Sequence, residues 1–217
     1  MSPEEELSSS PEDPEEALVR RAAAGDGDAL QELLARSVPA LQSAFGRAIP
    51  SEFRSALDAD DLIQVTLIEG FLRFGTFAYR GNGSFAAWLR RLTENNLRDG
   101  LRELRRAKRF PRHRAVSLHR DSDSYVVLLE RIGGSTTTPS GGAARLEAKE
   151  LIERGIVRLP PDYERVVRLM DLEGLSGPEA AISIGRSEGA VYMLRMRAHA
   201  LLREFLGSGS KFFSDGA

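Results

Sequence analysis

A regular series of aromatic, polar and basic side chains runs along residues 84–109, a segment that contains the only tryptophan of the chain, Trp88. Its members recur at steps of three and four residues, so on a helix they share one face. Guanidinium groups bind phosphates, an amide can bond to a base edge, and an indole can stack on an unpaired base. The series therefore indicates a nucleic-acid face. It comprises Trp88, Arg91, Asn95, Asp99, Arg102 and Arg106.

The same segment also has a structural interpretation. Phe85, Leu89 and Leu92 form an apolar edge beside this face, and we expect that edge to pack on the preceding helices. Trp88 would then be half-buried core and the arginines a solvated surface. The segment alone leaves both interpretations open.

Residues 175–205 have the pattern of a helix-turn-helix. Ser176 and Glu179 have the spacing of a capping box, and Pro178 lies in the first turn, where proline is tolerated. Gly185 suits the tight turn, and Ser187 can cap the second helix, whose N-terminal residues would enter a major groove. A plain three-helix core could produce the same pattern. The predicted DNA contacts are Arg186, Ser187, Glu188, Ala190, Tyr192 and Met193, with Arg195 and Arg197 near the DNA backbone.

Catalysis finds little support in the residue types. The chain has no cysteine, no Walker-type phosphate loop and no His-Glu metal spacing, and its three histidines are isolated among arginines. Asp58, Asp60 and Asp61 precede a helical pattern, where capping explains them more simply than a metal or acid/base site. We expect no enzymatic activity, no metal and no cofactor.

The elements that must position these residues are all helical. Helical periodicity without period-two alternation predicts an all-α fold. We expect a first helix to end at Gly25 and a second to break near Pro39. A helix opening at the aspartates and a Gly/Asn-rich loop at residues 78–84 should precede the Trp88 helix.

Composition divides the chain into two small helical domains joined by a flexible linker. The stretch GGSTTTPSGG (133–142) has the composition of a connector. The first sixteen residues hold seven acidic residues and no basic ones, which is too polar to fold alone. The predicted divisions are an acidic disordered tail at 1–16, a helical domain at 17–114, a linker at 115–147, a helix-turn-helix domain at 148–206 and a polar tail at 207–217.

The formal net charge of -2 conceals a basic region. Residues 90–114 hold ten basic and three acidic side chains, which favours a polyanionic partner. No apolar run approaches the roughly 18 residues of a membrane span, and the N-terminus has no secretory pattern. The absence of cysteine suits a reducing compartment. We expect a cytoplasmic protein that does not enter a membrane.

Three stretches together resemble the extracytoplasmic-function (ECF) sigma factors of bacterial RNA polymerase. DADDLIQVTL (58–67) and GNGSFAAWLRRLTENNLRDGLR (81–102) resemble the family's region 2. LPPDYERVVRLMDLEGLSGPEAAISIGRSEGAV (159–191) resembles region 4. The chain departs from the family pattern at Val65 and at residues 192–194, which are Tyr, Met and Leu.

This resemblance implies partners and residue roles. Asp61, Leu62 and Gln64 would dock on the β′ clamp of core RNA polymerase, while region 4 also touches the β flap. The partners would be core polymerase and promoter DNA, both as duplex and as melted non-template strand, with an anti-sigma factor as a further implied regulator. The minus-ten site would combine the face of the Trp88 helix with Phe85 and the base-capturing loop residues Tyr79, Arg80, Gly81 and Asn82.

The expected function is that of a promoter-specificity subunit. Such a protein binds core polymerase, recognises the minus-ten and minus-thirty-five elements and promotes promoter opening. One alternative is a stand-alone helix-turn-helix transcriptional regulator. Another is a decoy that keeps the fold and binds polymerase or an anti-sigma factor without opening promoters.

Overall fold

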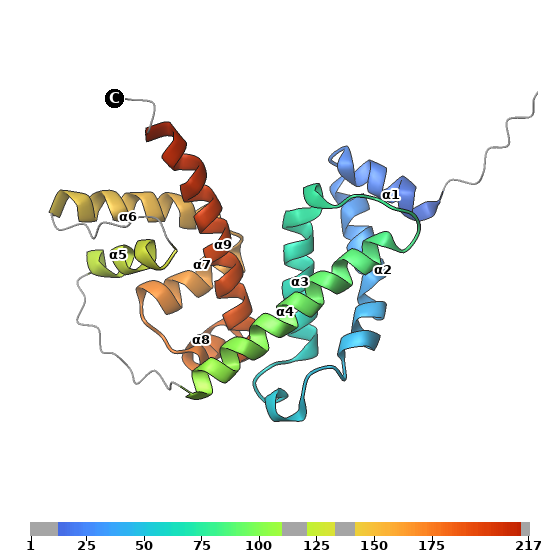
Figure 1. Ribbon diagram of the computed structural model, residues 1–217, viewed down its shortest axis with the longest axis horizontal. Coiled ribbons are helices and arrows are strands. Elements are labelled where there is room, and N and C mark those ends of the chain that lie inside the picture. Colours follow the sequence, from blue (N-terminus) through green and yellow to red (C-terminus); the bar gives the residue numbers. More distant parts are fainter. Residues whose placement is uncertain (1–12, 110–120, 133–141, 214–217) are drawn as a thin grey trace, which may run out of the picture.

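The computed structural model describes residues 13–109, 121–132 and 142–213. Within these ranges the regular elements are all helices and no strand occurs, which confirms the predicted all-α fold. Figure 1 shows two groups of helices, α1 to α4 and α5 to α9. The groups meet where the end of α4 (green) packs against the beginning of α9 (red).

Aspartate caps start three helices of the first group. The side chains of Asp13, Asp26 and Asp58 each accept a hydrogen bond from the backbone N–H two residues later, which satisfies an N–H group that a helix start leaves free. Gly25, with φ of 94°, separates the first two helices as predicted. The elements are α1 Pro14–Ala23, α2 Gly27–Phe45, the 3-10 turns η1 Ser51–Phe53 and η2 Phe74–Thr76, α3 Ala59–Arg73 and α4 Ser84–Arg109.

The predicted break near Pro39 is wrong, because α2 continues through this residue. Pro39 is exposed, so its ring lies on the solvent side of the helix. Leu33, Leu41 and Phe45 are buried on the opposite side, before and after the proline. Packing on both sides therefore keeps the helix continuous despite the missing backbone donor.

The helix-turn-helix pattern of the second group is present as predicted. The hydroxyl of Ser176 and the carboxylate of Glu179 form a capping box at the start of α8, and Pro178 lies in the first turn. Gly185 ends α8 in a left-handed conformation with φ of 75°, which glycine adopts without steric cost. The elements are α5 Asp121–Arg131, α6 Gly142–Ile156, α7 Pro161–Val167, a π-helical turn η3 Arg168–Leu172, α8 Gly177–Ile184 and α9 Glu188–Phe213.

Helical structure also lies within the range predicted as linker. The helix α5 and the first residues of α6 fall between 115 and 147, and α5, whose Leu128 is fully buried, packs on α6 and η3. Helix α9 runs to Phe213, beyond the predicted domain end at 206. The masked stretches of the predicted divisions lie outside the described residues: 1–12 of the acidic tail, 110–114 of the first domain, 115–120 and 133–141 of the linker, and 214–217 of the polar tail.

A buried carboxylate joins three of these elements. Asp171 in η3 has a fully buried side chain and pairs with Arg131 of α5 (2.5 Å) and Arg195 of α9 (2.5 Å). The Nε2 atom of His199 lies 2.7 Å from the same carboxylate. Burial alone would raise the pKa of Asp171, but the hydrogen bonds from His199 and Arg195 outweigh it and hold this pKa well below the ordinary value.

Candidate nucleic-acid interface

Helix α4 has the two faces that its sequence predicts. Phe85, Leu89 and Leu92 are buried against the preceding helices. On the other side, Arg91 and Asn95 are exposed. The arginine-bearing face is therefore a surface of the first helical group.

Trp88 is half-buried in a cluster of aromatic rings. Its ring centroid lies 5.4 Å from that of Phe77 and 5.6 Å from that of Phe85. Phe85 is only 1% exposed, so it lies beneath the surface and supports Trp88 from below. These contacts fix the indole in place while part of it remains accessible, which suits a stacking platform.

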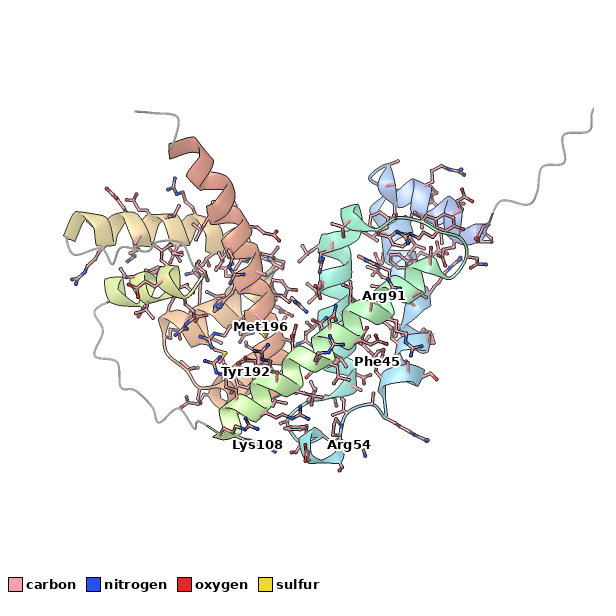
Figure 2. All side chains as sticks on the ribbon, viewed as in Figure 1. Phe45, Arg54, Arg91, Lys108, Tyr192 and Met196 are labelled. Atoms are coloured by element: carbon pink, nitrogen blue, oxygen red, sulfur yellow. The ribbon has the colours of Figure 1, made fainter. Side chains whose placement is uncertain are left out.

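The arginines of this face are accessible, and two make no internal pairing among the described residues. Arg91 and Arg102 are exposed and form no hydrogen bond or ion pair there, while Arg106 lies 3.6 Å from Glu103. Asn95 accepts a hydrogen bond from Arg98 (3.0 Å). Figure 2 shows Arg91 and Lys108 on the same helix. The face therefore offers positive charge at Arg91, Arg102 and Arg106.

The predicted base-capturing loop is held by the acidic end of α1. The carboxylate of Glu15 accepts hydrogen bonds from the backbone N–H groups of Gly83 (2.9 Å) and Phe85 (3.0 Å), at the start of α4. The Tyr79 hydroxyl donates to Asp13, and this bond raises the pKa of Tyr79 above its ordinary value. Local composition did not indicate either contact.

The loop residues 80–84 form a tight turn that is open to solvent. Gly81 and Gly83 have positive φ values of 106° and 82°, and the side chain of Asn82 is exposed between them. The backbone N–H of Arg80 donates to the Ser84 hydroxyl at 3.2 Å. The turn leaves the backbone accessible to a ligand.

We expect Glu15→Ala to loosen this loop. The variant leaves two backbone N–H groups at the start of α4, those of Gly83 and Phe85, without their carboxylate partner, which should lower stability by about 1 kcal/mol, as loss of a helix cap does. Hydrogen exchange at the amides of Gly83 and Phe85 should accelerate. Glu16→Ala, an exposed neighbour on α1, is the control and should leave both amides unchanged. Equal exchange in Glu15→Ala and the parent protein would contradict the capping role.

A polar cluster that the sequence analysis missed lies beneath the α4 face. Asn96 is fully buried and donates to the Thr66 hydroxyl (3.1 Å) and to the Glu69 carboxylate (3.0 Å). From α9, Arg197 donates to the Asn96 side-chain oxygen (2.8 Å) and to Asp99 (3.1 Å). Its Nε atom also lies 3.2 Å from Glu69, which is 4% exposed. This cluster joins α3, α4 and α9.

The predicted polymerase-binding residues lie at the start of α3. Leu62 is fully buried and belongs to the core, whereas Gln64 is exposed and Asp61 is half-buried. The Asp61 carboxylate accepts a hydrogen bond from the backbone N–H of Ser187 at 2.6 Å. Arg186 bonds to Gln64 and lies 3.5 Å from Asp61.

Several of the predicted minus-thirty-five residues are buried or paired with other residues of the protein. Ala190 is fully buried and Met193 is 1% exposed. Arg195 pairs with Asp171, and Arg197 enters the polar cluster. The Ser187 hydroxyl makes no hydrogen bond among the described residues, so the expected side-chain cap is wrong, and the neighbouring backbone N–H binds Asp61 instead.

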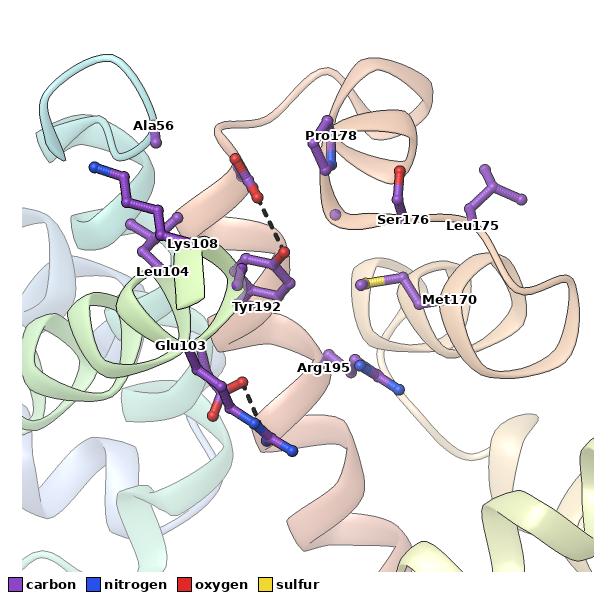
Figure 3. A pocket seen from close by; sticks show the side chains of 14 residues that line it. Ala56, Glu103, Leu104, Lys108, Met170, Leu175, Ser176, Pro178, Tyr192 and Arg195 are labelled. Atoms are coloured by element: carbon purple, nitrogen blue, oxygen red, sulfur yellow. Dashed lines mark hydrogen bonds and ion pairs between the residues drawn. The ribbon is translucent and has the colours of Figure 1, made fainter. Parts of the chain in front are cut away.

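A cleft of about 610 Å³ lies between the end of α4 and the start of α8 and α9. Figure 3 shows Tyr192 and Arg195 facing it from α9, with Glu103, Leu104 and Lys108 on the side of α4. The Tyr192 hydroxyl donates to Glu188 at 2.9 Å. Three of the predicted recognition residues, Glu188, Tyr192 and Arg195, thus line a cleft that α4 closes on its other side.

The described ranges, 13–109, 121–132 and 142–213, contain neither a cluster of metal ligands nor a membrane-spanning helix. No group of three or more histidine, aspartate or glutamate side chains in these ranges is placed to hold a metal ion. No helix in them is both long and apolar enough to cross a membrane.

Two family models match the chain in succession. The model described as sigma-70 region 2 matches residues 28–107, which include α3 and all but the last two residues of α4. The model described as sigma-70, region 4 matches residues 149–202, which include the helix-turn-helix. Both candidate faces lie within the matched ranges.

Curated relatives cover most of the chain. It is 32% identical to the RNA polymerase sigma factor NccH of Alcaligenes xylosoxydans xylosoxydans, over 89% of this chain and 95% of that protein. It is 32% identical to the RNA polymerase sigma factor CnrH of Cupriavidus metallidurans, over 93% of this chain and 98% of that protein. It is 30% identical to the ECF RNA polymerase sigma factor BldN of Streptomyces coelicolor, over 87% of this chain but only 64% of that protein.

Among solved structures, the chain is similar to CnrH in complex with the cytosolic domain of CnrY. The two share 26% identity, with 90% of this chain and 99% of that chain covered and a TM-score of 0.32. The chain is also similar to the structure of the RsbN–BldN complex, with 22% identity, 86% of this chain and 97% of that chain covered, and a TM-score of 0.31.

Proposed function

Because the chain belongs to the extracytoplasmic-function sigma factors of bacterial RNA polymerase, we propose that it binds core polymerase and directs it to promoters. The observation that carries this proposal is the succession of region 2 and region 4 along one chain, with an arginine-bearing aromatic face in the first and a helix-turn-helix in the second. A stand-alone regulator needs only the second of these.

The α4 face and the preceding loop would hold the melted minus-ten strand. Accessible Arg91 and Arg102 would bind its phosphates, and the half-buried indole of Trp88 would stack at the edge of the unpaired bases. A base turned out of the strand would enter the loop at Tyr79, Arg80, Gly81 and Asn82. Asn95, Asp99 and Arg106 complete this face. Phe85, being buried, contributes by positioning Trp88.

The start of α9 would read duplex DNA at the minus-thirty-five element. Arg186, Glu188 and Tyr192 lie nearest the start of the helix, which is the end that enters a major groove in helix-turn-helix proteins. Asp61 and Gln64 would dock on the polymerase clamp, with Leu62 holding the helix from the core side. These roles use α3, α4 and α9 of a single chain.

We also infer how the chain is divided and where the protein acts. We divide the chain into region 2 at 17–114, a connecting segment at 115–147 that includes α5, and region 4 at 148–206. The chemistry of RNA synthesis would belong to the polymerase, and the protein would act where polymerase acts, in the bacterial cytoplasm.

Reconstituted transcription tests the proposal. Core polymerase is incubated with genomic fragments of the source organism, with and without the protein, and new transcripts are mapped. We expect initiation at specific positions only when the protein is present. A protein that binds duplex DNA but starts no transcript from any fragment would be the stand-alone regulator. One that binds core polymerase without initiation would be the decoy.

A further inference from the structure

Basic side chains from three helices gather where α4 meets the second helical group. The cleft of about 610 Å³ between α4, α8 and α9 adjoins a smaller cavity of about 200 Å³, and both are lined by Glu103, Arg106, Tyr192 and Arg195. We propose that the two form one binding site for a nucleoside polyphosphate, with the phosphates in the smaller cavity and the nucleoside in the larger cleft. This inference goes beyond the proposed function and does not rest on it.

The smaller cavity, which we call the basic cavity, is lined mainly by cationic groups. Arginine keeps its positive charge at any physiological pH. A concave site lined by charges of one sign concentrates their field and attracts ions of the opposite sign. The basic cavity is therefore suited to an anion. Its titratable lining among the described residues is Arg106 of α4, Arg131 of α5, Arg195 and His199 of α9, and one acidic side chain, Glu103.

The buried carboxylate of Asp171 holds three of these side chains in place without using all their donors. Arg131 bonds to it through Nη1 (2.5 Å), Arg195 through Nε (3.1 Å) and Nη2 (2.5 Å), and His199 through Nε2 (2.7 Å). Nη2 of Arg131 and Nη1 of Arg195 make no hydrogen bond within the described ranges. A guanidinium has five donors in one plane, so these two groups can still donate to a phosphate.

A purely structural role does not explain the charge of this cluster. The single carboxylate of Asp171 faces two guanidinium groups, those of Arg131 and Arg195. Arg106 and Glu103 form only a long, exposed pair at 3.6 Å, which contributes little. Asp171 also lies in the π-helical turn η3, a geometry that is frequent at functional sites. A bound phosphate would supply the negative charge that the cluster lacks.

The larger cleft offers the surface that a nucleoside needs. Figure 3 shows Leu104, Met170, Leu175 and Tyr192 around it. The hydrogen bond from the Tyr192 hydroxyl to Glu188 (2.9 Å) fixes the ring, on which an aromatic base can stack. A thioether and aliphatic side chains complete an apolar wall. The volume of this cleft is in the usual range for small-molecule sites.

The burial of the cluster favours a small ligand over a DNA backbone. The side chains of Arg195 and His199 are only 12% and 14% exposed. A duplex contacts an open surface, whereas a free phosphate chain can enter a cavity of this kind. If Arg131→Gln weakened binding of the full-length protein to duplex DNA while the parent protein bound no nucleotide, the cluster would be a DNA contact and the proposal would be overturned.

Calorimetric titration of the full-length protein tests the site directly. The probes are ATP, GTP, inorganic pyrophosphate and adenosine, in a buffer without phosphate. We expect at least one triphosphate to saturate at an equimolar ratio. Pyrophosphate and adenosine should each bind at least about tenfold more weakly, because each makes contacts in only one of the two cavities. Absence of saturable binding by both triphosphates overturns the proposal, and pyrophosphate binding as tightly as they do overturns the assignment to a nucleotide.

Substitutions on α4 and α5 assign the binding to these cavities. Arg131→Gln should weaken triphosphate binding about tenfold, the effect of losing a hydrogen bond to a charged group. Because this variant also loses an ion pair with Asp171, two variants of α4 provide a second test. Arg106→Gln should weaken binding about threefold, and Glu103→Gln should strengthen it about threefold by removing negative charge beside the phosphates.

The matched control is Arg105→Gln. It makes the same change of charge at an exposed position of α4 that lines neither cavity, so it should bind the triphosphate as the parent protein does. Circular dichroism establishes that each variant is folded. Equal losses in Arg105→Gln and Arg106→Gln, or weaker binding by Glu103→Gln, would show that the nucleotide binds elsewhere.

Discussion

Trp88→Ala is expected to slow opening of a duplex promoter by roughly five- to 150-fold while leaving core-polymerase binding nearly unchanged. Loss of one stacked base costs roughly 1–3 kcal/mol, and this cost falls on the step at which bases become unpaired. The measurement is the rate of open-complex formation by the reconstituted holoenzyme. On a template already melted at the minus-ten element, the variant should initiate at close to the parent rate.

The indole also packs on Phe77 and Phe85, so a packing defect must be separated from a stacking defect. Phe77→Leu perturbs the same aromatic cluster without removing the exposed part of Trp88. It should lower stability but retain promoter opening. Equal losses for Trp88→Ala on duplex and melted templates would show that the residue acts chiefly in the core.

Asp171→Asn is expected to destabilise the second domain by about 3–5 kcal/mol, the usual cost of removing one partner of a buried ion pair. The substitution removes the carboxylate that holds Arg131, Arg195 and His199 together. Urea unfolding followed by circular dichroism measures the loss. Glu173→Gln, an exposed acid just after η3, is the control and should change stability by no more than about 0.5 kcal/mol.

The same carboxylate gives a pH dependence with a definite sign. The pKa of Asp171 is lowered on folding, so its contribution to stability is complete above the ordinary carboxyl pKa and is lost as pH falls below about 4. The parent protein should lose stability more steeply than Asp171→Asn between about pH 4 and the acid limit of folding. Parallel curves for the two proteins would contradict this role.

Local periodicity was sufficient to predict the two faces of α4. Phe85, Leu89 and Leu92 are buried and Arg91 and Asn95 are exposed, because side chains of a helix repeat every 3.6 residues whatever packs on them. The start and the end of the first helix of the helix-turn-helix could also be predicted from local sequence, since capping boxes and left-handed glycines depend on neighbours within four residues.

Asn96 shows a signal that was present but not used. It continues the buried row of α4 at a step of four from Leu92, and Gly100 follows after four more. A polar side chain and a glycine do not look like core residues by type. Their position in the row could have identified Asn96 as a buried group that needs partners, which Thr66 and Glu69 provide.

The contacts between domains could not be predicted in this way. Asp61 and Ser187 are 126 positions apart, and Asn96 and Arg197 are 101 apart. Periodicity identifies which face of each helix is polar, but it does not identify which two polar faces meet. Pro39 illustrates a related limit, since buried residues on both sides of it kept intact a helix that the local rule would break.

The most direct test of the proposed function is to determine which part of the chain contacts which form of DNA. Since the parent chain lacks cysteine, Asn82→Cys and Tyr192→Cys can each carry a single photo-crosslinker in the holoenzyme on a mapped promoter. We expect position 82 to crosslink to the unpaired non-template strand at the minus-ten element and position 192 to crosslink to duplex DNA farther upstream. Crosslinks from position 192 to duplex DNA without polymerase, and none from position 82 to any unpaired strand, would contradict it.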